Sequence, residues 1–313
     1  MIFGVSQIVL NSLRPLQSGQ NPQLHKKIFI RHEYGQLGNI LFRLANALGY
    51  ALEHDFGVED YTLAFCNYHD GSSNIRFFEN YHSFHFFEYP YPRSRLINRI
   101  KWKIRDKNYR KSKMIENFDP SFDLSDLPPH SSYELKGFHF SAKDLVTKHR
   151  EKICQILDFR SSVKSPIETL LKKAKSKYDI LLGVHIREND FKDFYEGRYF
   201  VSASRYLEEI VHFKELNQGK SLGVLICSDS AKILLEIKER YPDYILPKGS
   251  VSQDMYALSQ CDYILGPQAT TMSAWAAYLG KVKLAQIIPE AESVDFSSFR
   301  HLSRLEPFYP FLN

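Results

Sequence analysis

The chemically most informative stretch of the chain is GVHIREND, residues 183–190. His185 and Arg187 are two residues apart, so on a β-strand their side chains project from the same face. An arginine at a strand end offers a planar guanidinium that matches the oxygens of a phosphate group. The stretch therefore has two interpretations: Arg187 binds the phosphate of a ligand, or it forms a surface ion pair with Asp190 or Asp193.

Two further polar loops follow apolar segments later in the chain. One is Ser-Asp-Ser at residues 228–230, and the other is GPQATT at residues 266–271. If the preceding segments are parallel strands, all three loops lie at the carboxyl edge of one sheet, where such sheets bind their ligands. We therefore expect the three loops to converge on a single ligand.

Apolar segments in the second half of the chain predict strands, and helical patterns separate them. The strands are expected at residues 180–186, 222–227, 263–265 and 282–288, and the helices at residues 203–216, 230–240, 252–259 and 271–279. Ser165, Pro166 and Glu168 fit the start of a preceding helix, and Gly280 fits the position just after a helix end. This alternation predicts a parallel sheet with helices on both faces.

The first half of the chain opens with a similar unit. A strand is expected at residues 26–31, a glycine loop at 34–39 and a helix at 39–54, with a later strand at 133–138 and a helix at 142–157. Residues 67–92 contain nine aromatic residues without a helical period, which either stack on sugars or pack in the core. The length of 313 residues suits two domains, expected at residues 1–160 and 161–313.

Three motifs, which follow one another along the chain at residues 35–40, 185–190 and 254–261, resemble signatures of the α-1,2-fucosyltransferase family. Members of this family use GDP-fucose, and the resemblance is in particular to its bacterial members. Residues 185–190 are similar to the family signature H-x-R-R-x-D, and GQLGNI at residues 35–40 is similar to its glycine loop G-x-L-G-N-Q. DMYALSQC at residues 254–261, with the Thr pair and WAAYL that follow, is similar to its C-terminal signature. The chain departs from the family at Glu188, which replaces the second Arg, and at Ile40, which replaces the Gln.

The resemblance implies an α/β fold of the GT-B type, in which two Rossmann-like domains enclose the active site in a cleft. Residues 1–160 would form the acceptor side and residues 161–313 would bind the nucleotide sugar. The implied activity is inverting transfer of fucose from GDP-fucose to a glycan hydroxyl, of the galactoside α-1,2 type. Because of Glu188 and Ile40, transfer of another GDP-linked sugar and a non-catalytic nucleotide- or glycan-binding module remain alternatives.

The resemblance also implies roles for individual residues. Arg187 would bind the β-phosphate, where negative charge develops as the glycosidic bond breaks. His185 and Asp190 are further catalytic candidates. The residues expected to contact the diphosphate or the nucleoside are Gly35, Gly38, Asn39, Ser228, Asp229, Asp254, Thr270, Thr271 and Ser273. A tight turn is the alternative role for the glycines, and helix capping is the alternative for the hydroxyl groups.

The base that activates the acceptor hydroxyl is left open among Asp190, His32 and Glu33. The chain has no D-x-D motif of the kind that holds a divalent ion. We therefore expect a metal-independent reaction in which Arg187 takes the place of such an ion, with no resident cofactor.

Composition narrows the class of protein further. Apolar residues make up 43% of the chain and charged residues 25%, which is typical of a globular protein. The four cysteines have no C-x-x-C spacing, which disfavours zinc ribbons and predicts reduced thiols. No segment approaches the roughly 20 apolar residues of a membrane span, so we expect a cytoplasmic protein.

The net charge of +5 is concentrated between residues 93 and 113, which hold ten Lys and Arg residues and one acidic residue. Ile97, Ile100 and Ile104 recur there at helical spacing, with Trp102 among them. A basic amphipathic helix of this kind is typical of peripheral contact with an anionic inner membrane, and a helix packed on its own domain is the alternative. A charge this local does not indicate nucleic-acid binding.

Overall fold

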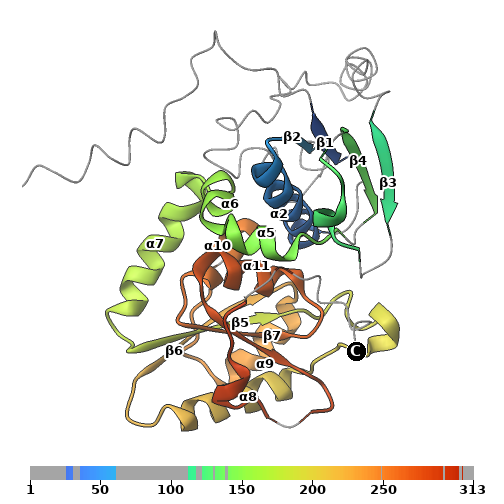
Figure 1. The fold of residues 1–313 in the computed structure, drawn as a ribbon. Coiled ribbons are helices and arrows are strands. Elements are labelled where there is room, and N and C mark those ends of the chain that lie inside the picture. Colours follow the sequence, from blue (N-terminus) through green and yellow to red (C-terminus); the bar gives the residue numbers. More distant parts are fainter. Residues whose placement is uncertain are drawn as a thin grey trace, which may run out of the picture.

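The structure is a computed structural model that describes residues 26–30, 36–60, 112–117, 122–129, 131–137, 140–247, 249–291, 293–302 and 305. Within these residues the chain forms two four-stranded sheets whose strand pairs are all parallel (Figure 1). Helices pack between the sheets and on the far side of the second one. The predicted α/β class is confirmed.

The first sheet has the strand order β2-β1-β4-β3. Its strands are β1 (Lys27–Ile30), β2 (Gly57–Asp60), β3 (Lys113–Asn117) and β4 (Tyr133–Gly137). The helix α2 (Leu37–His54) follows β1, and the 3-10 turn η4 (Leu124–Asp126) lies between β3 and β4. The helices α5 (Lys143–Lys148) and α6 (Arg150–Ile156) follow β4. The single helix expected at residues 142–157 is therefore two helices, because the backbone leaves the helical conformation at His149 (φ −98°, ψ 14°).

The second sheet has the order β6-β5-β7-β8, so β5 lies inside it and the strand order reverses at β5 and β7. Its strands are β5 (Ile180–Ile186), β6 (Leu222–Ser228), β7 (Tyr263–Pro267) and β8 (Lys283–Ile287). All seven residues of β5 are buried, as expected for a strand covered on both faces. In open parallel sheets such a reversal point is where ligands bind, outside the carboxyl ends of the strands.

Two groups of helices cover this sheet. Its outer face carries α8 (Ala203–Leu216) and α9 (Ala231–Arg240), whose apolar residues share one core with the strands. The face toward the first half carries α7 (Ser161–Lys175), α10 (Val251–Ser259) and α11 (Thr271–Gly280) (Figure 1). Two 3-10 turns complete this half, η5 (Phe194–Gly197) and η6 (Phe296–Ser298).

Two predictions of helix ends are wrong. Helix α7 begins at Ser161, not at Ser165, because the buried stripe that holds it against the core already starts at Val163. Helix α11 ends on Gly280, and Lys281 takes the left-handed position after it with φ 54°. Gly280 is required for another reason: a Cβ at this position would collide with the carbonyl oxygen of Ser259 on α10.

The two halves share one apolar core, which runs from the first sheet through α2 to α10 and α11. The rings of Phe42 on α2 and Trp275 on α11 lie 6.5 Å apart, and the Tyr278 hydroxyl donates to the carbonyl oxygen of Val146 at 3.0 Å. The sheets lie on either side of residue 160 in the sequence, and a domain boundary at that residue stays a prediction.

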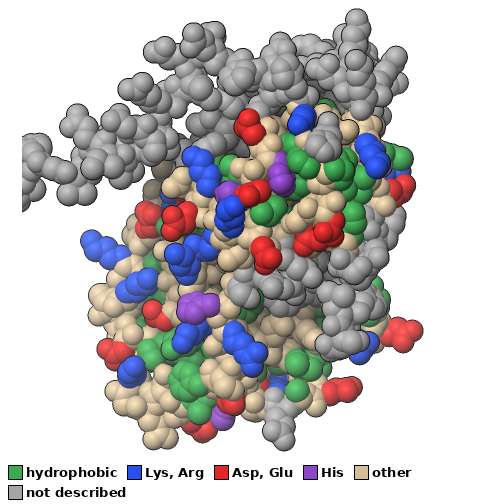
Figure 2. Space-filling model, viewed as in Figure 1, with side chains coloured by type: hydrophobic (Ala, Val, Ile, Leu, Met, Phe, Trp, Pro, Cys, Tyr) green, Lys and Arg blue, Asp and Glu red, His purple; other side chains and the backbone are tan. Residues whose placement is uncertain are grey.

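The surface in Figure 2 carries both signs of charge, with the described Lys and Arg side chains interspersed among Asp and Glu. Apart from residues 112 and 113, the basic segment 93–113 lies outside the described residues, so its proposed membrane contact stays a prediction. The aromatic segment 67–92 also lies outside them. Within the described part of the chain, no helix has the length and apolarity needed to cross a membrane.

Candidate active site

The first turns of α2 and α11 meet at the junction of the two halves. Each helix follows a strand of its own sheet, so each begins at a carboxyl edge. The hydroxyl of Thr271 donates to Oδ1 of Asn39 at 2.8 Å. A Cβ on Gly38 would collide with Oγ1 of Thr271 and lie 3.0 Å from the backbone nitrogen of Met272. Gly38 is thus required for the close approach of the two helix starts.

Neither of these helix starts is capped by its own side chain. Gln36 and Thr270 occupy the N-cap positions with extended backbones, and neither side chain bonds to the following backbone N–H groups. The first N–H groups of a helix have no partner within it, and they carry the positive end of the helix dipole. Two such ends side by side favour an anion, and a diphosphate offers several oxygens to both.

Arg187 follows β5 directly and is held from several sides. Its Nε and Nη2 donate to the two carboxylate oxygens of Asp190 at 2.8 and 2.5 Å, and Oδ2 of Asp229 lies 4.0 Å from Nε. The guanidinium lies over the ring of Phe191, 5.5 Å from its centroid. Among the described residues none accepts a hydrogen bond from Nη1, so this edge of the group remains available to a ligand. The ion pair with Asp190 and a phosphate contact are therefore compatible.

The contact with Arg187 also changes the acidity of Asp190. The hydrogen bonds from Arg187 hold the pKa of its carboxyl below the ordinary value. A carboxylate with a lowered pKa is a weaker base, so this geometry suits Asp190 to orienting Arg187 better than to taking a proton. The other two candidates for the base, His32 and Glu33, lie outside the described residues.

Glu188, which departs from the family signature, points toward α9. Its carboxylate accepts from the hydroxyl of Ser230, the N-cap of α9, and lies 2.7 Å from Nζ of Lys192. The hydrogen bonds from Lys192 and Ser230 lower its pKa, so the buried carboxylate is ionised and paired. The repulsion of a diphosphate that its charge would cause is thereby reduced.

His185 lies buried beneath the start of α11. Its Nδ1 is 3.4 Å from the hydroxyl of Thr270. Burial and the nearby charge of Arg187 lower the pKa of His185 to about 3, so the imidazole is neutral at physiological pH. Ser273, in the first turn of α11, is fully buried, and its hydroxyl has no hydrogen-bond partner among the described residues. The contact of His185 fits a role in positioning Thr270.

The loop after β6 is tied to the loop after β5. Oδ1 of Asp229 accepts from the backbone N–H of Glu188 at 2.9 Å, and the Asn189 amide donates to the Asp229 carbonyl at 2.5 Å. Ser228 accepts from the backbone N–H of Ser230 at 3.1 Å. These bonds join two of the three polar loops that the sequence predicted to converge.

Asp254 lies in α10, near the end of β6, where the thiol of Cys227 lies 3.7 Å from its backbone carbonyl. Burial raises the pKa of its carboxyl to about 7. Asp254 is only partly accessible to solvent, and a carboxyl group with a raised pKa in such a position is a candidate for a functional role.

The structure thus brings most of the expected residues to one junction. Gly38 and Asn39 meet Thr271, and His185 and Arg187 lie close to Thr270 and Asp229 respectively. Gly35 lies outside the described residues. Nucleotide binding by these residues stays a prediction. No cluster of three or more His, Cys, Asp or Glu side chains that could hold a metal is found in the described part of the chain.

Sequence reasoning missed two groups at this site. Lys192 forms an ion pair with Glu188, and the Ser230 hydroxyl donates a hydrogen bond to it. The four-residue spacing of Glu188 and Lys192 was the signal for the first contact, whereas the polar loop at residues 228–230 gave no hint that Ser230 would meet Glu188. The second group is a set of aromatic rings in the loop after Arg187. Their only signal in the sequence is the density of aromatic residues between Phe191 and Phe200.

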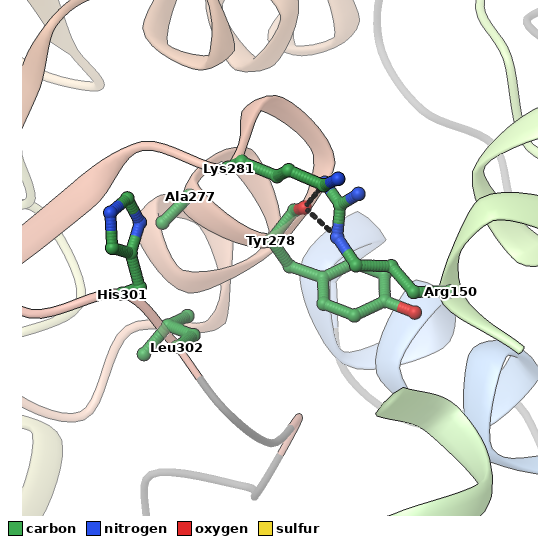
Figure 3. Close-up of a pocket in the computed structure, with 6 residues that line it drawn as sticks. All are labelled: Arg150, Ala277, Tyr278, Lys281, His301 and Leu302. Carbon is green, nitrogen blue, oxygen red and sulfur yellow. Dashed lines mark hydrogen bonds between the residues drawn. The ribbon is translucent and has the colours of Figure 1, made fainter. Parts of the chain in front are cut away.

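A cavity of about 280 Å³ lies at the opposite end of α11 (Figure 3). It is lined by Arg150, Ala277, Tyr278, Lys281, His301 and Leu302. Arg150, from the first half, donates to the carbonyl oxygens of Tyr278 and Leu279 and lies over the Tyr278 ring. It therefore holds the C-terminal end of the helix whose first turn lies in the candidate site.

Replacing Arg150 by alanine is expected to lower the free energy of unfolding by about 1–3 kcal/mol, because the last carbonyls of α11 lose a charged donor. Chemical denaturation would measure the change. Arg240→Ala, at an exposed helix end, is the matched control and should change stability little. Equal stability of the two variants would show that the hydrogen bonds from Arg150 to the end of α11 contribute nothing to stability.

Comparison with known proteins gives one family and one fold. The sequence model of glycosyl transferase family 11 matches residues 39–302 of this chain. Among curated proteins, none matches this chain. The fucosyltransferase NodZ from Bradyrhizobium has a similar structure, with 17% identity, a TM-score of 0.57 and coverage of 86% of this chain and 99% of that one.

Two other solved structures are similar. A FUT1 variant from Arabidopsis thaliana in complex with GDP shares 14% identity, with a TM-score of 0.55 and coverage of 99% of this chain and 81% of that one. POFUT1 in complex with GDP shares 12% identity, with a TM-score of 0.51 and coverage of 83% and 95%. At such identities the likeness concerns the fold, and the expected GT-B-like arrangement is confirmed.

Proposed function

The chain belongs to glycosyl transferase family 11, as its motifs indicated, and on that premise we propose that it moves fucose from GDP-fucose to a hydroxyl group of a glycan, with inversion. The solved structures of similar fold support fucose and GDP, since they include fucosyltransferases in complex with GDP and with GDP-fucose. For the linkage we propose α-1,2 to a galactoside. NodZ is an α-1,6-fucosyltransferase, so the shared fold does not decide the linkage.

The observation that carries this proposal is the meeting of two uncapped helix starts near the end of β5. The first turns of α2 and α11 offer backbone N–H groups, and the loop after β5 supplies the guanidinium of Arg187. The leaving group of the proposed reaction is a diphosphate, whose charge grows as the bond to the sugar breaks. Fixed donors and a fixed cation stabilise that growing charge more than the ground state.

In the proposed reaction the acceptor oxygen attacks the anomeric carbon from the face opposite the diphosphate. The bond between that carbon and the β-phosphate oxygen breaks, and its electron pair stays on the phosphate beside Arg187. The acceptor proton passes to a base, for which we propose His32 or Glu33, with Asp190 orienting Arg187. Thr270, with His185 beneath it, would complete the phosphate contacts.

The nucleoside would lie along the ends of β5 and β6. Asp254 and Asp229 are proposed to accept hydrogen bonds from the guanine or the ribose, and Ser228 directly precedes Asp229 in the chain. On the phosphate side we propose Gly35, Gly38, Asn39, Thr271 and Ser273. Burial of the Ser273 hydroxyl means that a ligand would reach it only if the start of α11 moves.

Isothermal titration calorimetry with GDP, GDP-fucose, GDP-mannose, UDP and CMP, followed by a transfer assay in EDTA, tests this function. We expect GDP and GDP-fucose to bind, UDP and CMP to fail, and turnover to survive EDTA because Arg187 and the helix starts hold the leaving group. Faster turnover of GDP-mannose than of GDP-fucose would show that GDP-mannose is the donor. Tight GDP binding with no turnover of any donor would indicate a binding module, and activity restored by Mn²⁺ would indicate a metal-assisted reaction.

A further inference from the structure

The loop that follows Arg187 has an unusual backbone. Tyr195 (φ 47°, ψ 49°), Glu196 (φ 58°, ψ 31°) and Gly197 (φ 76°) are three consecutive residues in the left-handed region. Residues with a Cβ avoid this region, and when they occur there they do so as single residues. Two such residues in succession mean that the surrounding contacts impose this conformation, and strain of this kind concentrates at functional sites.

Several backbone hydrogen bonds hold the loop in place. The N–H of Phe194 donates to the carbonyl of Asp190 at 2.9 Å, and that of Arg198 donates to the carbonyl of Tyr195 at 3.1 Å. A Cβ on Gly197 would lie 3.0 Å from the carbonyl oxygen of Lys192, so this position requires glycine for space as well as for φ. The loop is therefore a defined structure that carries strain.

The strained loop arranges four aromatic rings in a series, here called the aromatic ladder: Phe191, Phe194, Tyr195 and Tyr199. The Phe191 and Phe194 rings are stacked with centroids 5.5 Å apart, and Tyr195 meets Phe194 edge to face at 4.6 Å. The ladder starts at Phe191, against which the guanidinium of Arg187 lies. It therefore leads from the proposed phosphate contact outward to Tyr195.

Exposure changes along the ladder. Phe191 and Tyr199 are buried, whereas Tyr195 is 47% exposed. The Tyr195 ring packs against the rings of Phe194 and Tyr199, and this packing still leaves nearly half of the residue exposed. The strained backbone therefore holds a partly exposed tyrosine eight positions after Arg187 in the sequence.

We propose that Tyr195 is a stacking platform for a sugar ring of the acceptor. The face of an aromatic ring is electron-rich and attracts the C–H groups on the apolar face of a pyranose, while the phenol oxygen lies at the edge where it can bond to a sugar hydroxyl. An acceptor sugar must lie near the anomeric carbon of the donor, and thus near Arg187. The inference rests on the proposed function, which places the donor there.

Two glycine variants separate the ring from the strain. Tyr195→Gly and Glu196→Gly both place glycine in a left-handed position, but only the first removes the aromatic face. We expect both to melt at or above the wild-type temperature. In saturation-transfer NMR with lactose, methyl β-galactoside and methyl α-mannoside in the presence of GDP, Tyr195→Gly should weaken acceptor binding by about tenfold. Glu196→Gly and Tyr195→Phe should stay within about threefold of wild type, since both keep the ring.

Unchanged sugar binding by Tyr195→Gly would overturn the platform, and so would the failure of every sugar in the panel to bind the wild-type protein. Turnover of GDP-fucose, measured as release of GDP, reports separately on the proposed function. A protein that binds lactose through Tyr195 but never consumes GDP-fucose would keep the platform and lose the proposed function. If the wild-type protein consumes GDP-fucose and Tyr195→Gly loses neither turnover nor sugar binding, the proposed function is kept and the platform is lost.

Discussion

Replacing Arg187 by alanine is expected to lower kcat/KM by about 10²–10³-fold, which corresponds to about 3–4 kcal/mol of transition-state stabilisation. The guanidinium is fixed by Asp190 and Phe191 before any ligand binds, so its charge requires no reorganisation during the reaction. The loss should appear in kcat, because the diphosphate gains charge only as the sugar leaves. Steady-state kinetics with GDP-fucose would measure it.

Two control variants test the reason for that loss. Arg187→Lys keeps the charge but not the planar fork, so we expect partial activity. Arg198→Ala removes an exposed arginine from the same loop and should leave turnover near the wild-type value. Asp190 is 51% exposed, so water can solvate its carboxylate in Arg187→Ala and the fold should survive. Near-normal turnover of a folded Arg187→Ala variant would leave Arg187 as no more than a structural ion-pair residue.

Asp254→Asn is expected to stabilise the free protein at pH 8 by about 1–2 kcal/mol, with little effect near pH 4. Burial raises the pKa of the Asp254 carboxyl from its ordinary 3.8 to about 7. Between these values the folded protein keeps a proton that the unfolded chain has lost. Stability therefore falls as the pH rises from about 4 to about 7, and asparagine removes that dependence. Thermal unfolding at several pH values would measure the difference.

The same variant should have the opposite effect on nucleotide affinity. If Asp254 accepts from the N–H groups of guanine, a charged acceptor is worth about 1.5–3 kcal/mol, so GDP should bind about 10–100-fold more weakly to Asp254→Asn. Wild-type affinity should rise as the pH passes through 7, because the carboxylate must be ionised to accept both bonds. Asp243→Asn, on an exposed loop, is the control for calorimetry. Equal GDP affinity in both variants would remove Asp254 from the proposed site.

The sequence by itself determined the second half of the fold and the place of its polar loops. Residues 180–186 form β5 over the predicted range, and the strands at 222–228 and 263–267 start where the apolar segments start. Buried parallel strands are apolar on both faces, so composition alone marks them. The loops that follow them must then share an edge, because parallel strands all end on the same side.

The first half was less predictable for a physical reason. The strands β2 (GVED) and β3 (KMIEN) are short and partly polar, and neither was expected. They exist because β1 and β4 offer them a parallel partner, and pairing of that kind leaves no periodic pattern in four or five residues.

Only the tertiary structure decided how the candidate site is completed. Asn39 and Thr271 are 232 positions apart, and Glu188 and Ser230 are 42 apart, so no local pattern records their contacts. The left-handed backbone at Tyr195 and Glu196 also has no signal in the residue types, because contacts elsewhere in the loop impose it on residues that avoid it. Periodicity reports which side of an element is buried, whereas the meeting of helix ends and loops depends on how the packed elements come together.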